Sequence, residues 1–165
     1  EPSMKCQSTR FGTFEVSDDT LLVFPSGILG FPDWTKYVLL DHDTDAPFKW
    51  LQCVEEPQLA FVILDPALFK PDYQVTIPTD ALIEIQKQGD DELSVVTILT
   101  IPSDDPTAVT ANLRGPLIMN HRTRLCKQLV LPEDLPTRYP LFAASPSVTT
   151  QPTSQPPQAS TRSAA

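Results

Sequence analysis

Apolar and polar residues alternate over short stretches along most of the chain, and this pattern predicts β-strands rather than helices. Proline, glycine or aspartate separates the stretches at short intervals, so each is long enough for one strand. Up to residue 101, we predict strands at residues 12–16, 21–24, 36–40, 48–54, 60–65, 73–77 and 93–101. A chain with so many consecutive short strands is typical of an all-β fold.

One short helix is expected over residues 81–87, where Leu82 and Ile85 share a face. Thr79 or Asp80 is a suitable residue to cap its start. Gly89 follows the apolar pattern and is expected to end the helix.

Residues 110–131 predict a positively charged β-hairpin. Residues 117–119 are apolar, residues 121–123 form a polar turn, and leucines then alternate with polar neighbours. The segment has no acidic residue, and its basic residues are Arg114, Arg122, Arg124 and Lys127. The preceding region, residues 15–105, contrasts with it, since 18 acidic residues stand there against four lysines.

These elements predict a small closed or nearly closed β-barrel-like single domain with one short helix. Barrel closure removes the exposed edge strands that a chain so rich in strands must protect. We expect a flexible N-terminus over residues 1–8, the barrel over residues 9–142 and a disordered C-terminal tail over residues 143–165. The tail is rich in Pro, Ser, Thr and Gln and has no aromatic residue, so it has too little apolar surface to fold.

The net charge of −9 and a pI near 4.5 count against direct binding of nucleic acid. An acidic field instead favours encounter with a basic protein, although excess acid also serves solubility alone. No apolar run is long enough for a membrane helix, and the first residues lack the pattern of a secretory signal. We therefore expect a cytoplasmic protein. Its three cysteines, Cys6, Cys53 and Cys126, include no C-x-x-C pair and do not suggest a disulfide framework or a zinc site.

Residues suited to catalysis are few. His42 and His121 are the only histidines, and no nucleophile motif or nucleotide-binding glycine motif occurs. The acidic stretch 41–45 lacks the glycine and the final glutamate of a calcium loop. We expect no enzymatic activity, no metal and no cofactor. A barrel that encloses a small apolar ligand, or a cofactor-dependent enzyme, remains the alternative, and a core filled by the chain's own side chains is the default.

Three stretches together resemble the family of the flagellar assembly factor FliW. They are FPSGILGFPDW at 24–34, FKWLQCVEEPQLAFVILDP at 48–66 and TANLRGPLIMNHRTRLCKQLVL at 110–131. Their order and spacing match the family, and the resemblance covers about residues 9–142. Leu117, where the family usually has isoleucine, is a mild departure, and the tail has no counterpart in the typical member.

The resemblance implies a bacterial cytoplasmic factor that binds two proteins in turn. One is CsrA, a small RNA-binding dimer that represses flagellin synthesis, and the other is flagellin. Because the two exclude one another, accumulated flagellin would leave CsrA free to repress, and export of flagellin would release the factor to antagonise CsrA.

Several residues are candidates for these contacts. The proline- and glycine-rich stretch 24–34 cannot be a helix or a central strand, so we interpret it as an apolar loop folded against the body or against a partner. Acids beside apolar strands suit basic CsrA. The resulting candidate partner-binding residues are Phe24, Gly27, Ile28, Gly30, Phe31, Asp41, Asp43, Asp45, Glu55, Glu56, Asn112 and Asn120. A competing interpretation is a direct RNA binder that uses Arg122, Arg124 and Lys127.

Overall fold

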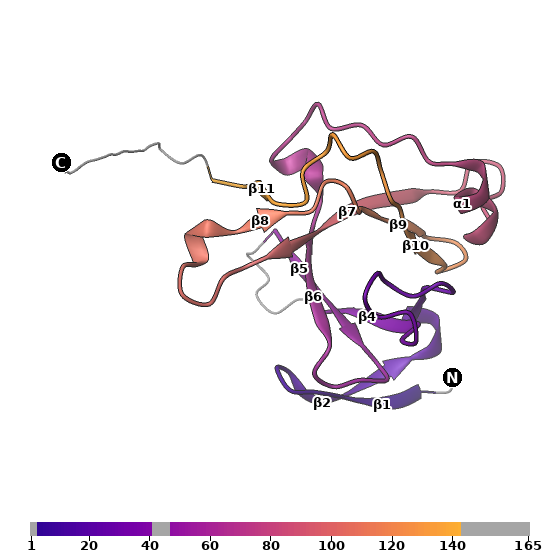
Figure 1. Ribbon diagram of the computed structural model, residues 1–165. Helices are drawn as coiled ribbons and strands as arrows, with labels where there is room; N and C mark the ends of the chain where they lie inside the picture. Colours follow the sequence, from indigo (N-terminus) through magenta and orange to yellow (C-terminus); the bar gives the residue numbers. More distant parts are fainter. Residues whose placement is uncertain (1–2, 41–46, 143–165) are drawn as a thin grey trace. The chain divides into compact units, whose positions relative to one another are not determined.

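A computed structural model of the chain describes residues 3–40 and 47–142, and Figure 1 traces it as a ribbon. The predicted tail and the acidic stretch 41–45 lie outside the described residues. The chain divides into two compact units, which we describe separately. Of the described residues, the larger unit holds 3–40, 47–99 and 112–137, and the smaller unit holds 100–111 and 138–142.

The larger unit is built on one antiparallel path of strands (Figure 1). Their order in space is β10-β9-β7-β6-β5-β4-β3. In chain order the strands are β3 (Leu22–Val23), β4 (Lys36–Leu40), β5 (Lys49–Cys53), β6 (Ala60–Leu64), β7 (Leu93–Thr100), β9 (Leu117–Asn120) and β10 (Cys126–Gln128). Each neighbouring pair is antiparallel. Short connections join β4 to β5, β5 to β6 and β9 to β10, and segments of this length allow only antiparallel neighbours.

The two ends of this path approach each other. Val23 of β3 forms a parallel bridge with Leu125, next to β10, and its N–H donates to the Arg124 carbonyl at 2.9 Å. One bridge is not a continuous ladder, so the sheet is nearly closed rather than closed. The predicted all-β, barrel-like fold is thus confirmed in its nearly closed form.

The N-terminal residues form a hairpin, and the expectation of a flexible segment over residues 1–8 is wrong for most of it. β1 (Ser3–Ser8) pairs along its whole length with β2 (Gly12–Ser17). The Ser8 hydroxyl accepts the N–H groups of Arg10 and Phe11 and so stabilises the turn. Cys6 also packs into a small buried cluster, a tertiary contact that the polar character of these residues does not reveal.

Two local predictions need correction. Residues 73–77 were predicted as a strand, but their main chain pairs with no other strand. The side chains of Val75 and Ile77 pack against a buried cluster, which accounts for the alternating apolar pattern. The predicted helix is α1 (Thr79–Glu84), which starts earlier and ends before Gly89. Gln86 takes a positive φ of 57°, which stops the helix, and Pro78 stands at its N-cap without a side-chain bond.

Buried side chains fill the larger unit. One cluster joins Phe24, Tyr37, Leu51 and Leu117 across the strands, and a second lies between α1 and the end of the path. Cys126 belongs to the first cluster, and burial raises the pKa of its thiol to about 12. The predicted hairpin over residues 110–131 is confirmed in β9, the turn after it and β10.

In the smaller unit β8 (Thr110–Ala111) pairs with β11 (Tyr139–Pro140). One further hydrogen bond extends this pairing beyond the two strands, since the Leu141 N–H donates to the Val109 carbonyl at 3.1 Å. The remaining elements of the described chain are short 3-10 turns: η1 (Asp18–Thr20), η2 (Pro66–Leu68) and η3 (Pro106–Ala108). In the part of the chain that the structure describes, no helix has the length and apolar character needed to cross a membrane.

Candidate partner-binding surface

The loop of residues 24–34 is held by its own main chain. The Phe24 N–H donates to the Thr35 carbonyl at 2.8 Å, the Gly27 N–H to Phe24 at 2.8 Å, and the Phe31 N–H to Ile28 at 2.7 Å. These bonds close two successive turns. The loop is therefore a defined structure that carries apolar side chains at fixed positions.

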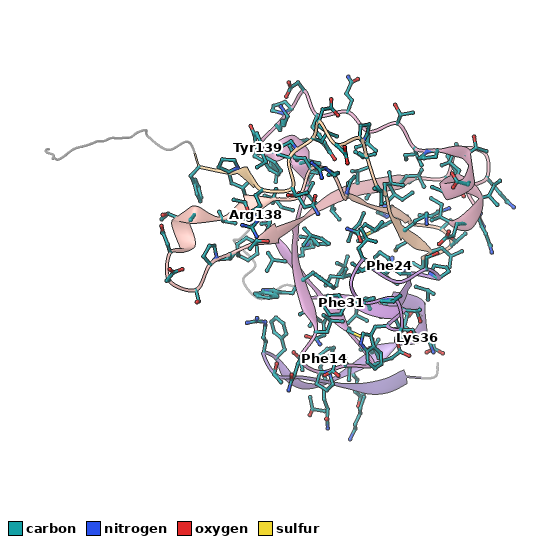
Figure 2. The ribbon with its side chains drawn as sticks, in the orientation of Figure 1. Phe14, Phe24, Phe31, Lys36, Arg138 and Tyr139 are labelled. Atoms are coloured by element: carbon teal, nitrogen blue, oxygen red, sulfur yellow. The ribbon has the colours of Figure 1, made fainter. Side chains whose placement is uncertain are left out.

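Burial separates the apolar residues of this loop into two groups. Phe24 and Ile28 are buried at 0% and 2% exposure, so their side chains belong to the core and are closed to a partner in this conformation. Of the two interpretations of this loop, the structure has these two side chains folded against the body and β4, and direct contact of either residue with a partner stays a prediction. Leu29 is 64% exposed and Phe31 38%, and Figure 2 labels Phe24 and Phe31. The surface of the loop is thus Leu29 and part of Phe31.

Gly27 and Gly30 both have positive φ, a backbone conformation that glycine adopts without strain. A side chain at Gly27 would lie 2.6 Å from the Cα of Pro32, whereas one at Gly30 would meet nothing within 4 Å. Gly27 therefore allows two backbone segments of the loop to approach closely. This is a structural role, and neither glycine offers a side chain to a partner.

Gln128 of β10 fastens the tip of the loop to a segment far along the chain. Its Oε1 accepts the Leu29 N–H at 2.8 Å, and its Nε2 donates to the Gly115 carbonyl at 3.0 Å. A Cβ at Gly115 would lie 2.8 Å from Nε2 of Gln128, so a side chain there would have to displace the Gln128 amide. Asn112 fixes the same turn, and its Oδ1 accepts the N–H groups of Arg114 and Gly115 at 3.0 Å. Asn112 thus supports the surface from behind.

An apolar patch lies where these segments meet. Val130 follows β10 and is 72% exposed, and between it and Leu29 is a shallow hollow of about 100 Å³. The hollow is lined by Leu29, Asn112, Arg114, Gly115, Leu129, Val130 and Thr137. We call the exposed side chains of Leu29 and Val130 with this hollow the Leu29–Val130 patch. Exposed apolar side chains held on a rigid frame suit a protein partner.

Asn120 holds the hairpin turn together from inside. Its side chain is fully buried, its Nδ2 donates to the Ile85 carbonyl and to Asp91 Oδ2 at 3.1 Å each, and its Oδ1 accepts the Arg122 N–H at 3.0 Å. Each polar atom of the amide has a partner within the protein. The side chain of Asn120 is used inside the turn and does not reach the surface, and a contact with a partner stays a prediction.

The guanidinium of Arg122 binds the same carboxylate. Its Nε donates to Asp91 Oδ1 at 2.8 Å, and this hydrogen bond holds the pKa of Asp91 well below its usual range. Bonds from the Gln88 N–H and the Asn120 amide lower it further, against the opposing effect of burial. The turn, Asp91 and the end of α1 form one bonded group.

The basic residues of residues 110–131 are engaged inside the larger unit. Arg114 donates to the Leu135 and Glu133 carbonyls, and Arg124 to the Thr20 and Leu21 carbonyls. Lys127 lies 3.2 Å from Glu84, whose other oxygen accepts the Ser26 hydroxyl. Arg122 is still 49% exposed while it binds Asp91. Each of the three residues considered for RNA binding thus has a partner within the protein, and direct RNA binding stays an untested alternative.

Glu55 and Glu56 occupy the turn between β5 and β6. Glu55 Oε1 accepts the Thr35 N–H at 3.2 Å, at the exit of the loop, and Glu56 Oε2 accepts the Gln58 N–H at 3.1 Å. The turn is held from below by buried Gln52, whose Nε2 donates to carbonyls that include Pro57 and Leu59. Glu55 is exposed and Glu56 partly so, and a role in partner contact stays a prediction for both.

Asp41, Asp43 and Asp45 lie outside the described residues, so their part in a binding surface also stays a prediction. Among residues 3–40 and 47–142, no cluster of His, Cys, Asp or Glu has the arrangement of a metal site.

Comparison with known proteins decides the family. The sequence model of the family described as FliW protein matches residues 5–141. A flagellar assembly factor FliW of Natranaerobius thermophilus is 41% identical over 84% of this chain and 93% of its own length. One from Leptospira interrogans is 39% identical over 77% of this chain and 85% of its own.

This chain belongs to the FliW family. A crystal structure of the flagellar assembly factor FliW is also similar, with a TM-score of 0.78 and 31% identity over 85% of this chain and 98% of that one. The resemblance identified from the three sequence stretches is confirmed.

In this FliW-family chain, the sequence analysis missed the residues that shape the surface. Leu29 sits between the two motif glycines and is the exposed tip of the loop, while Gln128 and Val130 come from the closing hairpin. The two glycines indicated that the chain turns here, but they do not distinguish exposed Leu29 from buried Ile28, which lies between them as well. No local signal marks Gln128, whose partners are a loop about 100 residues earlier and a turn that precedes β9.

Proposed function

We propose that this protein is a non-enzymatic, cytoplasmic regulator of flagellar assembly that binds CsrA and relieves its repression of flagellin synthesis, and binds flagellin in its place. The observation that carries the proposal is membership of the FliW family over residues 5–141. Such a protein acts by binding a partner and keeping it from its other target, so it requires exposed contact surfaces and no catalytic residues.

The Leu29–Val130 patch is the surface that we assign to flagellin. Two apolar side chains with exposures of 64% and 72% flank a hollow of about 100 Å³, which suits one apolar side chain of a partner. The hydrogen bonds of Gln128 fix the tip of the loop in advance, so little conformational freedom is lost on binding.

The acidic turn with Glu55 and Glu56 is the surface that we assign to CsrA. A net charge of −9 favours fast encounter with a basic protein, and this turn is held rigidly by Gln52. Glu55 also binds the exit of the loop at Thr35, which links the two surfaces. Partners that both cover the loop would exclude one another.

Isothermal titration calorimetry tests the partner switch. The full chain is titrated with CsrA from the same organism, and the titration is repeated after saturation with flagellin. We expect binding of CsrA that disappears when flagellin is present. Binding of both partners at once, or of neither, would contradict the proposal.

Leu29→Asp tests the assignment of the patch. Transferring a side chain that is 64% exposed into an interface is worth about 1–2 kcal/mol, so flagellin should bind about 5–30-fold more weakly. Leu68→Asp is the matched control, because Leu68 is 62% exposed, lies on η2 and is not among the residues that line the hollow. Equal loss in the two variants would remove the patch from the flagellin surface.

A further inference from the structure

Strand β7 is longer than the strand beside it. β6 pairs with it through Val62, Ile63 and Leu64, which lie opposite Leu99, Ile98 and Thr97. On its other side, β9 pairs with Leu93–Val96. The chain leaves β6 at Asp65 and reaches α1 without pairing again (Figure 1). Among the described residues, no strand therefore covers the β6 side of β7 over residues 93–96.

The main-chain groups on this uncovered side can be assigned from the hydrogen bonds of their neighbours. The Glu92 carbonyl accepts the His121 N–H at 3.0 Å, and the Ile98 carbonyl accepts the Asn112 N–H at 2.9 Å, both on the side away from β6. Directions alternate along a strand, so residues 94 and 96 point the same way as these two. The N–H and C=O groups of Leu93 and Val95 hence point to the open edge.

A groove lies along this edge. Its volume is about 370 Å³, and it is bounded by residues 93–96 on one side and by Asp65, Pro66, Ala67, Tyr73 and Val75 on the other. Tyr73 is fastened by a 2.6 Å bond from its hydroxyl to the Leu113 carbonyl, and Val75 packs into the cluster beside α1. The far wall is thus held by side chains and leaves the edge of β7 unpaired.

Proteins usually protect an open edge with proline, lysine or a bulge, and the sequence Leu-Ser-Val-Val at 93–96 has none of these. The volume of about 370 Å³ is within the range of ligand pockets and suits a short peptide segment, whereas the edge of a second copy would bring its own sheet with it. Asp65 is the charged residue among those that line the groove, and it stands where β6 ends. These features define the shape and the charge of the ligand.

We propose that this groove binds an extended peptide segment of a partner protein, which adds as a strand to Leu93 and Val95 and places a basic residue against Asp65. The segment runs antiparallel to β7 and continues the line of β6, so its N-terminal end lies at Asp65. Its residues opposite Leu93 and Val95 point toward Val75 and are apolar. This site is separate from the Leu29–Val130 patch and does not depend on the proposed function.

The test uses the peptide acetyl-Lys-Val-Ser-Val-Ser-Val-amide with the full chain, followed by NMR. We expect saturable shifts at residues 93–96 and slower hydrogen exchange at the Leu93 and Val95 amides. Two N-methylated peptides then probe the pairing without changing the protein. Methylation at the valines should weaken binding by about tenfold or more, the effect of losing two or more main-chain hydrogen bonds, and methylation at the serines by less than about twofold.

Asp65→Asn probes the charge. Asn retains the side-chain oxygen that accepts the Ala67 N–H at 2.9 Å, so the turn keeps its cap. The variant should bind the lysine peptide about threefold more weakly at low salt and a norleucine peptide equally well. Asp105→Asn is the matched control, because Asp105 caps η3 in the same Asp-Pro arrangement and accepts the Thr107 N–H at 3.1 Å outside the groove.

Four results would overturn the proposal. They are equal weakening by the two methylated peptides, shifts centred away from residues 93–96, no binding at millimolar peptide, and concentration-dependent dimerisation through β7, which would assign the edge to a second copy of the chain.

Discussion

A pair of glycine substitutions in the loop separates conformational strain from steric overlap. Gly27 has φ +70° and Gly30 has φ +88°, so alanine is strained at both by about 1–2 kcal/mol. At Gly30 nothing lies within 4 Å of an added Cβ, and the cost should end there. At Gly27 the Cβ would lie 2.6 Å from Pro32 Cα and 2.8 Å from two carbonyl oxygens, which adds about 1–3 kcal/mol of overpacking.

We therefore expect Gly27→Ala to lower the free energy of unfolding by about 2–5 kcal/mol and Gly30→Ala by about 1–2 kcal/mol. Urea unfolding measures both, and with a slope of about 1–3 kcal/mol per molar the midpoint of Gly27→Ala should fall by about 1 M or more. Gly12→Ala, at φ +74° with nothing within 4 Å, is a second control outside the loop. Equal losses for Gly27→Ala and Gly30→Ala would refute the argument that close backbone approach fixes the loop.

Two further predictions concern the bonded group at the hairpin turn. Asn120→Ala should lower the free energy of unfolding by about 1–3 kcal/mol, because it leaves the Arg122 N–H without its partner and removes one of the two donors to the Ile85 carbonyl, which keeps the Thr123 hydroxyl; a loss below about 1 kcal/mol in urea unfolding would contradict this. Asp91 has a lowered pKa, so its contribution to stability is fully present above its unfolded pKa of 3.8 and is lost as the pH falls below that value. Asp91→Asn should remove this part of the acid dependence, and an unchanged pH profile of the unfolding midpoint would show that the pair with Arg122 does not stabilise the fold.

The same contacts bear on how a partner switch could work. The loop is bonded to Thr35, Gln128 and, through Ser26, to Glu84 of α1. A partner that displaces the Leu29 tip must therefore break contacts shared by elements that are distant in sequence. Under the proposed function, the loop therefore offers a route by which one partner affects the other without contact to the same residues.

Much of the fold was accessible from the sequence. Alternation of apolar and polar residues located most strands of the larger unit, because side chains of a strand point to opposite faces and only one face is buried. It failed at residues 73–77, where Val75 and Ile77 alternate in the same way but pack without pairing. The alternation of apolar and polar residues predicts which side chains are buried. It does not predict whether the main chain forms hydrogen bonds with a neighbouring strand.

The candidate surface depended more heavily on tertiary structure. The three motif stretches identified the family, and the glycines marked the loop as turning. Which apolar residues of the loop face outward was decided by β4 beneath it and by Gln128 from about 100 residues away. The basic residues of the hairpin formed a charged group in the sequence but face the Thr20, Leu135 and Gln86 carbonyls and two carboxylates in the fold. Local sequence determines what a side chain can do, and the segments that fold against it determine what remains exposed for a partner.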